Sequence, residues 1–138
     1  MTTATFTNSG DRLKSGSPSE SSMNQNQPAV SHHNPSVNYE LQQANDTFYR
    51  GQHDVALGLF KGLTKAVPDD ARVWHCKGDL HDAMGNLNDA ARCYDTALEI
   101  DPTNAETWYN KGITLKNMGR DVESTTCIDH GLKLALGY

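Results

Sequence analysis

Several features of other protein classes are missing from this chain of 138 residues. It contains no run of about eighteen apolar residues, so we expect no membrane-spanning helix. Its opening segment, MTTATFTNSG, lacks the apolar stretch of a secretory signal peptide. Lysine and arginine are scattered, and the net charge of -5 argues against a nucleic-acid-binding surface. We therefore expect no membrane and no nucleic acid among the partners.

Cysteine is scarce as well. The three cysteines, Cys76, Cys93 and Cys127, are an odd number, and their spacing matches no metal site. This disfavours a disulfide framework, and we expect reduced thiols in a cytoplasmic protein. Cys93 and Cys127 are 34 residues apart, which suggests equivalent positions in a repeat.

What the chain does contain is an internal repeat with a period of 34 residues. Residues 71–104 match the segments on both sides when they are shifted by this length. A fixed period of this size indicates an array of helical repeats. The recurring positions are Trp74 and Trp108; Gly51, Gly85 and Gly119; Ala56 and Ala90; Phe60 and Tyr94; and Pro68 and Pro102.

Each repeat has the pattern of a helical hairpin. Residues 74–83 follow helical spacing, and Gly85 breaks the helix after three to four turns. A second helical stretch begins at Leu87 and stops before Pro102, because the residue preceding a proline is pushed out of the helical region. In the first repeat the same reasoning predicts helices over about 37–50 and 53–66.

Large and small residues have different expected roles in this hairpin. The small residues Gly78, Ala90 and Ala97 allow two helices to approach closely. Trp74 and Tyr94 are expected to fill the space between neighbouring hairpins. Replacing either by alanine costs about 3 to 5 kcal/mol where the side chain is fully buried.

This pattern resembles the tetratricopeptide repeat. That family has a large residue at the fourth position, small residues at the eighth, twentieth and twenty-seventh, an aromatic at the twenty-fourth and proline at the thirty-second. Here these places hold Trp74, Gly78, Ala90, Ala97, Tyr94 and Pro102. The resemblance covers residues 37–138 and implies an all-α solenoid of three antiparallel helix hairpins, over residues 37–70, 71–104 and 105–138.

Residues 1–36 have a different composition, dominated by Ser, Thr, Asn, Gln, Gly and Pro. We expect a disordered N-terminal tail, because its few apolar residues form no face. His32 and His33 offer a weak metal site or an ordinary solvated linker. Composition leaves open whether the tail folds into a groove of the array or is phosphorylated at its serines.

The resemblance also implies a function, which is the binding of a peptide in a concave groove lined by the first helix of each hairpin. Aromatic and aliphatic residues at the ends of the groove flank an acidic middle, which suggests a partner with apolar anchors around a Lys or Arg. The alternative is a solvated surface without a ligand. The groove positions carried over are Leu41, Asn45, Phe48, Tyr49, Arg72, His75, Asp79, Asp82, Tyr109, Asn110, Ile113 and Lys116.

A subset of the family holds the C-terminal carboxylates of heat-shock chaperones with two lysines, two asparagines and an arginine. In this sequence those places hold Leu41, Asn45, Cys76, Glu106 and Asn110. One of five matches, and Glu106 would repel a carboxylate. We therefore expect a protein or peptide partner other than a chaperone C-terminus.

One cluster has the residue types of an enzyme or metal site. His75, Asp79 and Asp82 share one helical face, and His81 is near in the sequence. Three weak ligands on the open surface of one helix exclude no water, and neither a nucleophile nor a phosphate-binding loop accompanies them. We expect no metal, no cofactor and no catalysis.

The last hairpin suggests a second kind of partner, another copy of the chain. Ile128, Leu132 and Leu136 are spread along its second helix, and we expect part of this apolar surface to face water. A weak two-fold homodimer through this surface is the expected result, with a monomer as the alternative. Head-to-tail stacking is disfavoured, because the opening of the first hairpin looks polar at Glu40 and Gln43.

Overall fold

The computed structural model describes residues 34–137, and every regular element in that range is an α-helix. This confirms the predicted all-α class. Residues 1–33, which contain most of the predicted disordered tail, lie outside the described residues. The helices are α2 (Pro35–Tyr49), α3 (His53–Ala66), α4 (Ala71–Ala83), α5 (Leu87–Ile100), α6 (Ala105–Asn117) and α7 (Asp121–Ala135).

The helix bounds agree closely with those expected from the sequence. The predicted segment 53–66 is α3, and the predicted segment 37–50 is α2 displaced toward the N-terminus. The helix α2 begins at Pro35, two residues before the expected start of the first repeat at residue 37. Proline suits the first position of a helix, where its missing N–H needs no partner.

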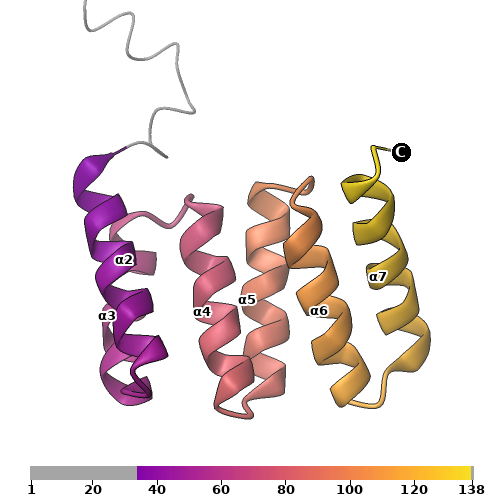
Figure 1. Ribbon diagram of the computed structural model, residues 1–138, viewed down its shortest axis with the longest axis horizontal. Helices are drawn as coiled ribbons and strands as arrows, with labels where there is room; N and C mark the ends of the chain where they lie inside the picture. The colour runs from indigo at the N-terminus through magenta and orange to yellow at the C-terminus, as the bar shows by residue number, and fades with distance from the viewer. Residues whose placement is uncertain (1–33, 138) are drawn as a thin grey trace, which may run out of the picture. The chain divides into compact units, whose positions relative to one another are not determined.

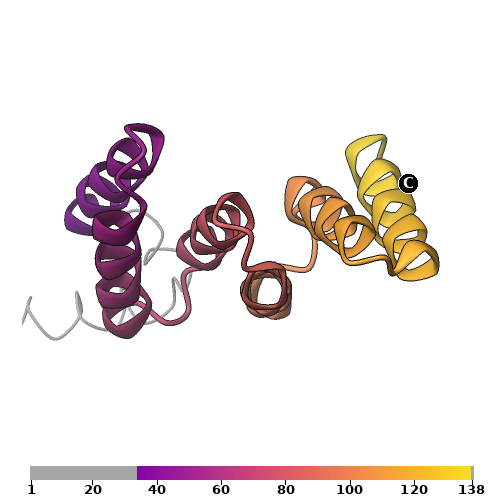
Figure 2. The same ribbon diagram turned by 90° about the horizontal axis from the view of Figure 1, so that it is seen from below.

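The six helices of the described region form three antiparallel hairpins, α2–α3, α4–α5 and α6–α7, which follow one another in chain order (Figures 1 and 2). The hairpins are joined by packing of α3 on α4 and of α5 on α6. The first helices also touch one another, α2 with α4 and α4 with α6, whereas α3, α5 and α7 lie too far apart for such contact. The first helices therefore line the tighter side of the array, where the predicted groove should be.

The turn within each hairpin has one conformation, repeated three times. Gly51, Gly85 and Gly119 have φ values of 82°, 80° and 81°, which favour glycine because it has no Cβ. The N–H that follows the glycine reaches back five residues, as from Asn86 to the carbonyl of His81 at 2.8 Å. This is the hydrogen bond that closes many helix C-termini, and it explains why Gly85 breaks the helix as predicted.

The connections between hairpins also repeat. The side chains of Asp70 and Asn104, 34 residues apart, accept hydrogen bonds at 3.0 Å from the backbone N–H groups of Arg72 and Thr107. Each therefore satisfies one of the unpaired donors at a helix start. Asp70 is thus the N-cap of α4, and Asn104 is the N-cap of α6.

Close packing inside the hairpins depends on small residues opposite large ones. A Cβ placed on Gly78 would lie 2.7 Å from Cε1 of Tyr94, and one placed on Gly112 would lie 2.5 Å from Cγ1 of Ile128. Tyr94 is fully buried, as is its counterpart Phe60 in the first hairpin. The structure thus confirms that Tyr94 is buried, but its ring packs on Gly78 of its own hairpin, whereas the sequence analysis placed it between neighbouring hairpins.

The predicted role of Trp74 is wrong. Its ring is only half-buried, its Nε1 donates to the carbonyl of Pro68 at 2.8 Å, and Lys77 Nζ lies 5.2 Å from the ring centroid. Trp108 makes the same hydrogen bond to Pro102. The tryptophans therefore fasten the first helix of a hairpin to the preceding connection and do not fill the space between hairpins.

The third hairpin departs from the repeat pattern at Ser124 and Gly131, and packing explains both residues. The buried Ser124 hydroxyl donates to the carbonyl of Gly112 at 2.7 Å. A Cβ on Gly131 would lie 2.9 Å from the carbonyl oxygen of Ala105, so an alanine would push α6 and α7 apart. The cysteines at the equivalent positions 93 and 127 are both buried free thiols.

Candidate peptide-binding groove

The helices α4 and α6 enclose a depression of about 340 Å³ on the side where the first helices touch. Five of the residues around it were predicted to line the groove. It is lined by Asp79, Asp82, Ala83, Tyr94, Tyr109, Asn110 and Ile113. The depression therefore combines two carboxylates and an amide with two tyrosines and two aliphatic side chains.

Asp79 is the centre of a hydrogen-bond network in the floor of this depression. The hydroxyl of Tyr94 donates to its Oδ1 at 2.5 Å, and Nδ2 of Asn110 donates to the same oxygen at 3.1 Å. Nε2 of His75 lies 3.3 Å from its other oxygen. Burial, followed by the bond to Asp79, raises the pKa of Tyr94, which keeps the phenol protonated as a donor. Asp79 is thus held in place from α4, α5 and α6 together.

His75 is held between two hairpins. Its Nδ1 lies 2.7 Å from Oγ1 of Thr107, and its Nε2 faces Asp79. Burial lowers the pKa of His75, but the hydrogen bond and charge of Asp79, with a smaller effect of Glu106, outweigh it, so the net pKa is raised. His75 consequently takes up a proton more readily than a free histidine.

Asp82 is the carboxylate that can still accept a hydrogen bond from a ligand. The hydroxyl of Thr114 donates to its Oδ1 at 2.8 Å, and within residues 34–137 no hydrogen bond is made to its other oxygen. The half-buried Ile113 and the exposed Tyr109 lie beside it around the depression. A charged oxygen next to apolar surface can accept a hydrogen bond from a ligand cation.

Leu41 is not a groove residue, contrary to the prediction. It is 8% exposed and belongs to the hydrophobic core together with Val73 and Phe60. A long aliphatic side chain at this position turns inward beneath α4, where it is removed from water. The neighbouring predicted residue, Asn45, is half-buried beside Cys76, whose thiol pKa burial raises to about 11 although hydrogen bonding by Asn45 opposes the shift.

The remaining predicted groove residues lie outside the depression. Phe48 and Tyr49 stack at 4.9 Å between ring centroids near the end of α2, and Tyr49 is 79% exposed. The guanidinium of Arg72 is already engaged by Asp70 and by Asn38 Oδ1 at 2.9 Å. Lys116 is exposed near the end of α6. These residues extend the surface but are not brought together with Asp82.

Sequence reasoning missed three residues that shape the site, Tyr94, Thr107 and Thr114. The two threonines are 1% exposed and occupy the repeat positions of Val73 and Leu80, which are core residues. A hydroxyl at a core position needs a hydrogen-bond partner. This was the available signal, since these threonines bond His75 and Asp82.

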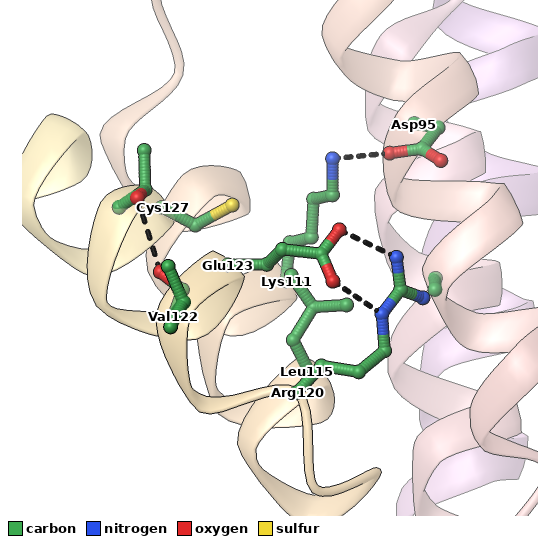
Figure 3. A pocket seen from close by; sticks show the side chains of 9 residues that line it. Asp95, Lys111, Leu115, Arg120, Val122, Glu123 and Cys127 are labelled. Carbon is green, nitrogen blue, oxygen red and sulfur yellow. Dashed lines mark hydrogen bonds and ion pairs between the residues drawn. The ribbon is translucent and has the colours of Figure 1, made fainter.

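A second depression, of about 270 Å³, lies between α5 and the hairpin α6–α7 (Figure 3). Lys111 pairs there with Asp95 at 2.5 Å, and Arg120 donates two hydrogen bonds to Glu123 at 2.7 and 2.6 Å. Because each charge around this depression has an opposite charge bound to it, we assign no ligand to it.

The residues predicted for self-association separate into two groups. Ile128 is half-buried and packs against Gly112. Leu132 and Leu136 are 49% and 70% exposed. Leu132 lines an apolar depression with Ala105, Glu106, Tyr109, Gly131 and Ala135.

Histidines and carboxylates do not converge on a metal in the described part of the chain. No group of three or more His, Cys, Asp and Glu is placed to hold an ion within residues 34–137. His81 is buried away from His75, with its Nδ1 at 3.5 Å from Asn86 Nδ2. None of the helices α2 to α7 is long and apolar enough to span a membrane.

Comparisons with known proteins agree with the helical hairpins. A family described as "TPR repeat" matches residues 78–119. The ER membrane protein complex subunit 2-B of Xenopus laevis is 31% identical over 87 residues, which are 63% of this chain and 29% of that protein. This chain thus spans less than a third of that relative.

Solved structures show the same fold at low sequence identity. The Yersinia enterocolitica type III secretion chaperone SycD, in complex with a peptide of the translocator YopD, has a TM-score of 0.70 at 18% identity, over 73% of this chain and 77% of that one. The Sgt2 TPR domain of Aspergillus fumigatus has a TM-score of 0.71 at 16% identity, over 75% of this chain and 69% of that one.

Proposed function

We propose that this chain, which belongs to the tetratricopeptide repeat family, is a non-enzymatic interaction module that binds a partner peptide in the groove of α4 and α6. The peptide carries a Lys or Arg between apolar residues. Its cation binds at Asp82, and its apolar side chains contact Tyr109 and Ile113. The peptide complex of SycD supports peptide binding by this fold and gives no information on the sequence preferred here.

The observation that carries this proposal is the spare oxygen of Asp82 beside apolar surface. Asp79 already accepts two hydrogen bonds and faces His75, whereas Asp82 accepts one, from Thr114. An ammonium or guanidinium group satisfies such an oxygen with a charge-assisted hydrogen bond, which is about twice as strong as a neutral one. The neighbouring Tyr109 provides contact area at little cost in side-chain entropy.

The charges around the groove also disfavour a C-terminal carboxylate as the ligand. Asp79, Asp82 and the exposed Glu106 are acidic, and Arg72 is neutralised by Asp70. The buried Leu41 and the half-buried Cys76 offer no positive charge. A chaperone C-terminus would therefore meet repulsion where it needs cations.

A matched set of labelled peptides tests the groove. One has Arg between Leu and Phe residues, and the others replace this Arg by Glu or Gln. By fluorescence anisotropy we expect the Arg peptide to bind at least about tenfold more tightly than the Glu peptide, a difference of about 1.4 kcal/mol. Asp82→Asn should weaken the Arg peptide by about tenfold, because the amide keeps the bond to Thr114 and loses the charge. Tyr109→Ala should weaken the binding of all three peptides, because it removes apolar contact area that they share.

The matched control is Glu99→Gln, which removes one negative charge from the exposed surface of α5. It should leave binding unchanged, so that an effect of net charge is separated from an effect of Asp82. Equal affinity for the Arg and Glu peptides, or equal effects of Asp82→Asn and Glu99→Gln, contradicts the proposed groove.

A second candidate function is self-association through the third hairpin. The exposure of Leu132 and Leu136 favours it, since apolar depressions on soluble proteins commonly mark contact sites. Ile128 does not contribute, because its side chain packs within the hairpin.

A further inference from the structure

Both ends of the array expose positions that are buried inside it. At the C-terminal end Leu132 is 49% exposed, whereas the equivalent Leu98 and Thr64 are 7% and 8% exposed because the next hairpin covers them. At the N-terminal end Leu59 is 41% exposed, whereas the equivalent Cys93 and Cys127 are each 6% exposed. Each end therefore presents half of the interface that joins neighbouring hairpins.

The N-terminal end is polar only in part, because apolar surface of α3 lies beside Glu40 and Gln43. Gly58 and Gly62 lie one turn apart on α3 and leave open space where side chains would stand. The result is a depression of about 460 Å³ with an apolar floor. It is lined by Glu40, Gln43, Gly58, Leu59, Gly62 and Leu63.

We propose that copies of this chain stack head to tail, with the N-terminal end of one copy on the C-terminal end of the next, in the register of the hairpins inside the array. This inference rests on self-association, the second candidate function, and replaces the two-fold pairing expected from the sequence. The occupant of each end is the other end of a second copy.

The internal register fixes which residues meet between copies. Inside the array, side-chain contacts join each hairpin to the next at defined repeat positions. They are Arg72 to Asn38, His75 to Thr107, Asn110 to Asp79, Thr114 to Asp82, and Lys111 to Asp95.

The same repeat positions can be applied to the third hairpin and the first hairpin of a second copy. They then bring five pairs of residues together, and four of the five pairs match in chemistry. The pairs are Glu106 with Asn38, Tyr109 with Tyr39, Ile113 with Gln42, Lys116 with Asp46, and Asp129 with Gln43.

These pairs are complementary in charge. Lys116 faces Asp46 of the next copy, the amides at 38 and 43 can donate to the carboxylates of Glu106 and Asp129, and none of the five pairs joins like charges. A two-fold pair through the C-terminal end places two copies of Glu106 and of Asp129 in one interface. The Lys116–Asp46 pair and the two amide–carboxylate pairs therefore favour head-to-tail stacking.

Sedimentation of the full chain and of two end-blocked variants tests this arrangement. Over about a hundredfold range of concentration, we expect the weight-average mass of the native chain to rise more than about twofold without stopping at a dimer. Leu59→Glu blocks the N-terminal end and Leu132→Glu blocks the C-terminal end, so each variant alone should remain monomeric. An equimolar mixture should form dimers and nothing larger, because each pair has one intact junction.

Several outcomes overturn the proposal. Dimerisation of Leu59→Glu alone shows two-fold pairing through the C-terminal end, and dimerisation of Leu132→Glu alone shows pairing through the N-terminal end. A native chain that stays monomeric, or a mixture that stays monomeric, excludes stacking. Circular dichroism confirms that both variants keep their helices.

Charge exchange tests the register. Lys116→Glu should reduce association by at least about tenfold through its contact with Asp46 of the next copy, and adding Asp46→Lys to the same chain should restore it. Failure of the second change to restore association contradicts the register. Leu59→Glu should still bind the Arg peptide, because Leu59 lies outside the groove. A native chain that fails to stack therefore does not contradict the groove proposal. Likewise, a chain that fails to bind the peptide does not contradict the stacking proposal.

Discussion

The missing side chain of Gly78 sets how closely α4 and α5 approach. The ring of Tyr94 lies against its Cα, and this contact positions the phenol to reach Asp79. A glycine in the middle of a helix costs conformational entropy, so it is retained where nothing larger fits. Packing inside the hairpin and the geometry of the groove therefore depend on the same residue.

Replacing Gly78 by alanine should destabilise the protein by about 1 to 3 kcal/mol, because the new Cβ displaces the buried Tyr94 ring. Gly58→Ala is the matched control, since Gly58 is also helical but has open space around it. It should stabilise by about 0.5 to 1 kcal/mol through the smaller entropy of the unfolded chain. Urea unfolding in dilute solution measures the change in the free energy of unfolding for each variant. A stabilising Gly78→Ala would refute the close contact between Gly78 and Tyr94.

Two histidines on α4 respond to pH in opposite directions. The pKa of His75 is raised above 6.5, where burial opposes and the interactions with Asp79 and Glu106 prevail, and the pKa of His81 is lowered by burial. The folded state therefore binds more protons at His75 and fewer at His81 than the unfolded state. The contribution of His75 is complete below pH 6.5 and is lost as the pH rises through its raised pKa.

The contribution of His81 is complete above pH 6.5 and is lost as the pH falls through its lowered pKa. We therefore predict that the free energy of unfolding, measured in urea between about pH 5 and pH 8, has a maximum near pH 6.5. His75→Gln should flatten the alkaline side of the curve and His81→Gln the acidic side. A curve whose two sides are unaffected by these changes contradicts the assignment.

At the scale of helices and turns, the sequence was sufficient to predict closely where most helices begin and end. Gly85, Pro102 and Asn104 act through the backbone near their own positions, and local chemistry of this kind is visible without a structure. The burial of Tyr94 followed from its place in the repeat. The contact made by Trp74 could not be predicted in the same way, because its hydrogen bond to Pro68 depends on the path of the connection before α4.

The candidate groove was only partly predictable for a related reason. Asp79, Asp82 and Tyr109 could be placed on one side of the array because repeat positions carry over. Whether a carboxylate is free or already bound depends on side chains of the next hairpin, such as Asn110 and Thr114. Only the three-dimensional register shows that Asp82, and not Asp79, has an oxygen to spare.

At the scale of the whole array, stability is a sum over hairpins and the junctions between them. The hairpin α4–α5 has a neighbour on each side, whereas α2–α3 and α6–α7 have one each within the described residues. The cores also differ in content. The buried residues of α5 include Tyr94 and Leu98, while those of α7 are Ser124, Cys127 and Gly131. We infer that α7 is the weakest helix and α5 the strongest.

Native-state hydrogen exchange should show this gradient. We expect amides of α5 to exchange at least about tenfold more slowly than those of α7, because α7 opens without disrupting a large buried side chain. Uniform exchange rates along the array would mean that it opens only as a whole.

The same measurement at high protein concentration separates the two proposed functions. Head-to-tail stacking protects α2 and α3 at one end and α6 and α7 at the other, whereas an Arg peptide in the groove also protects α4, which carries Asp82.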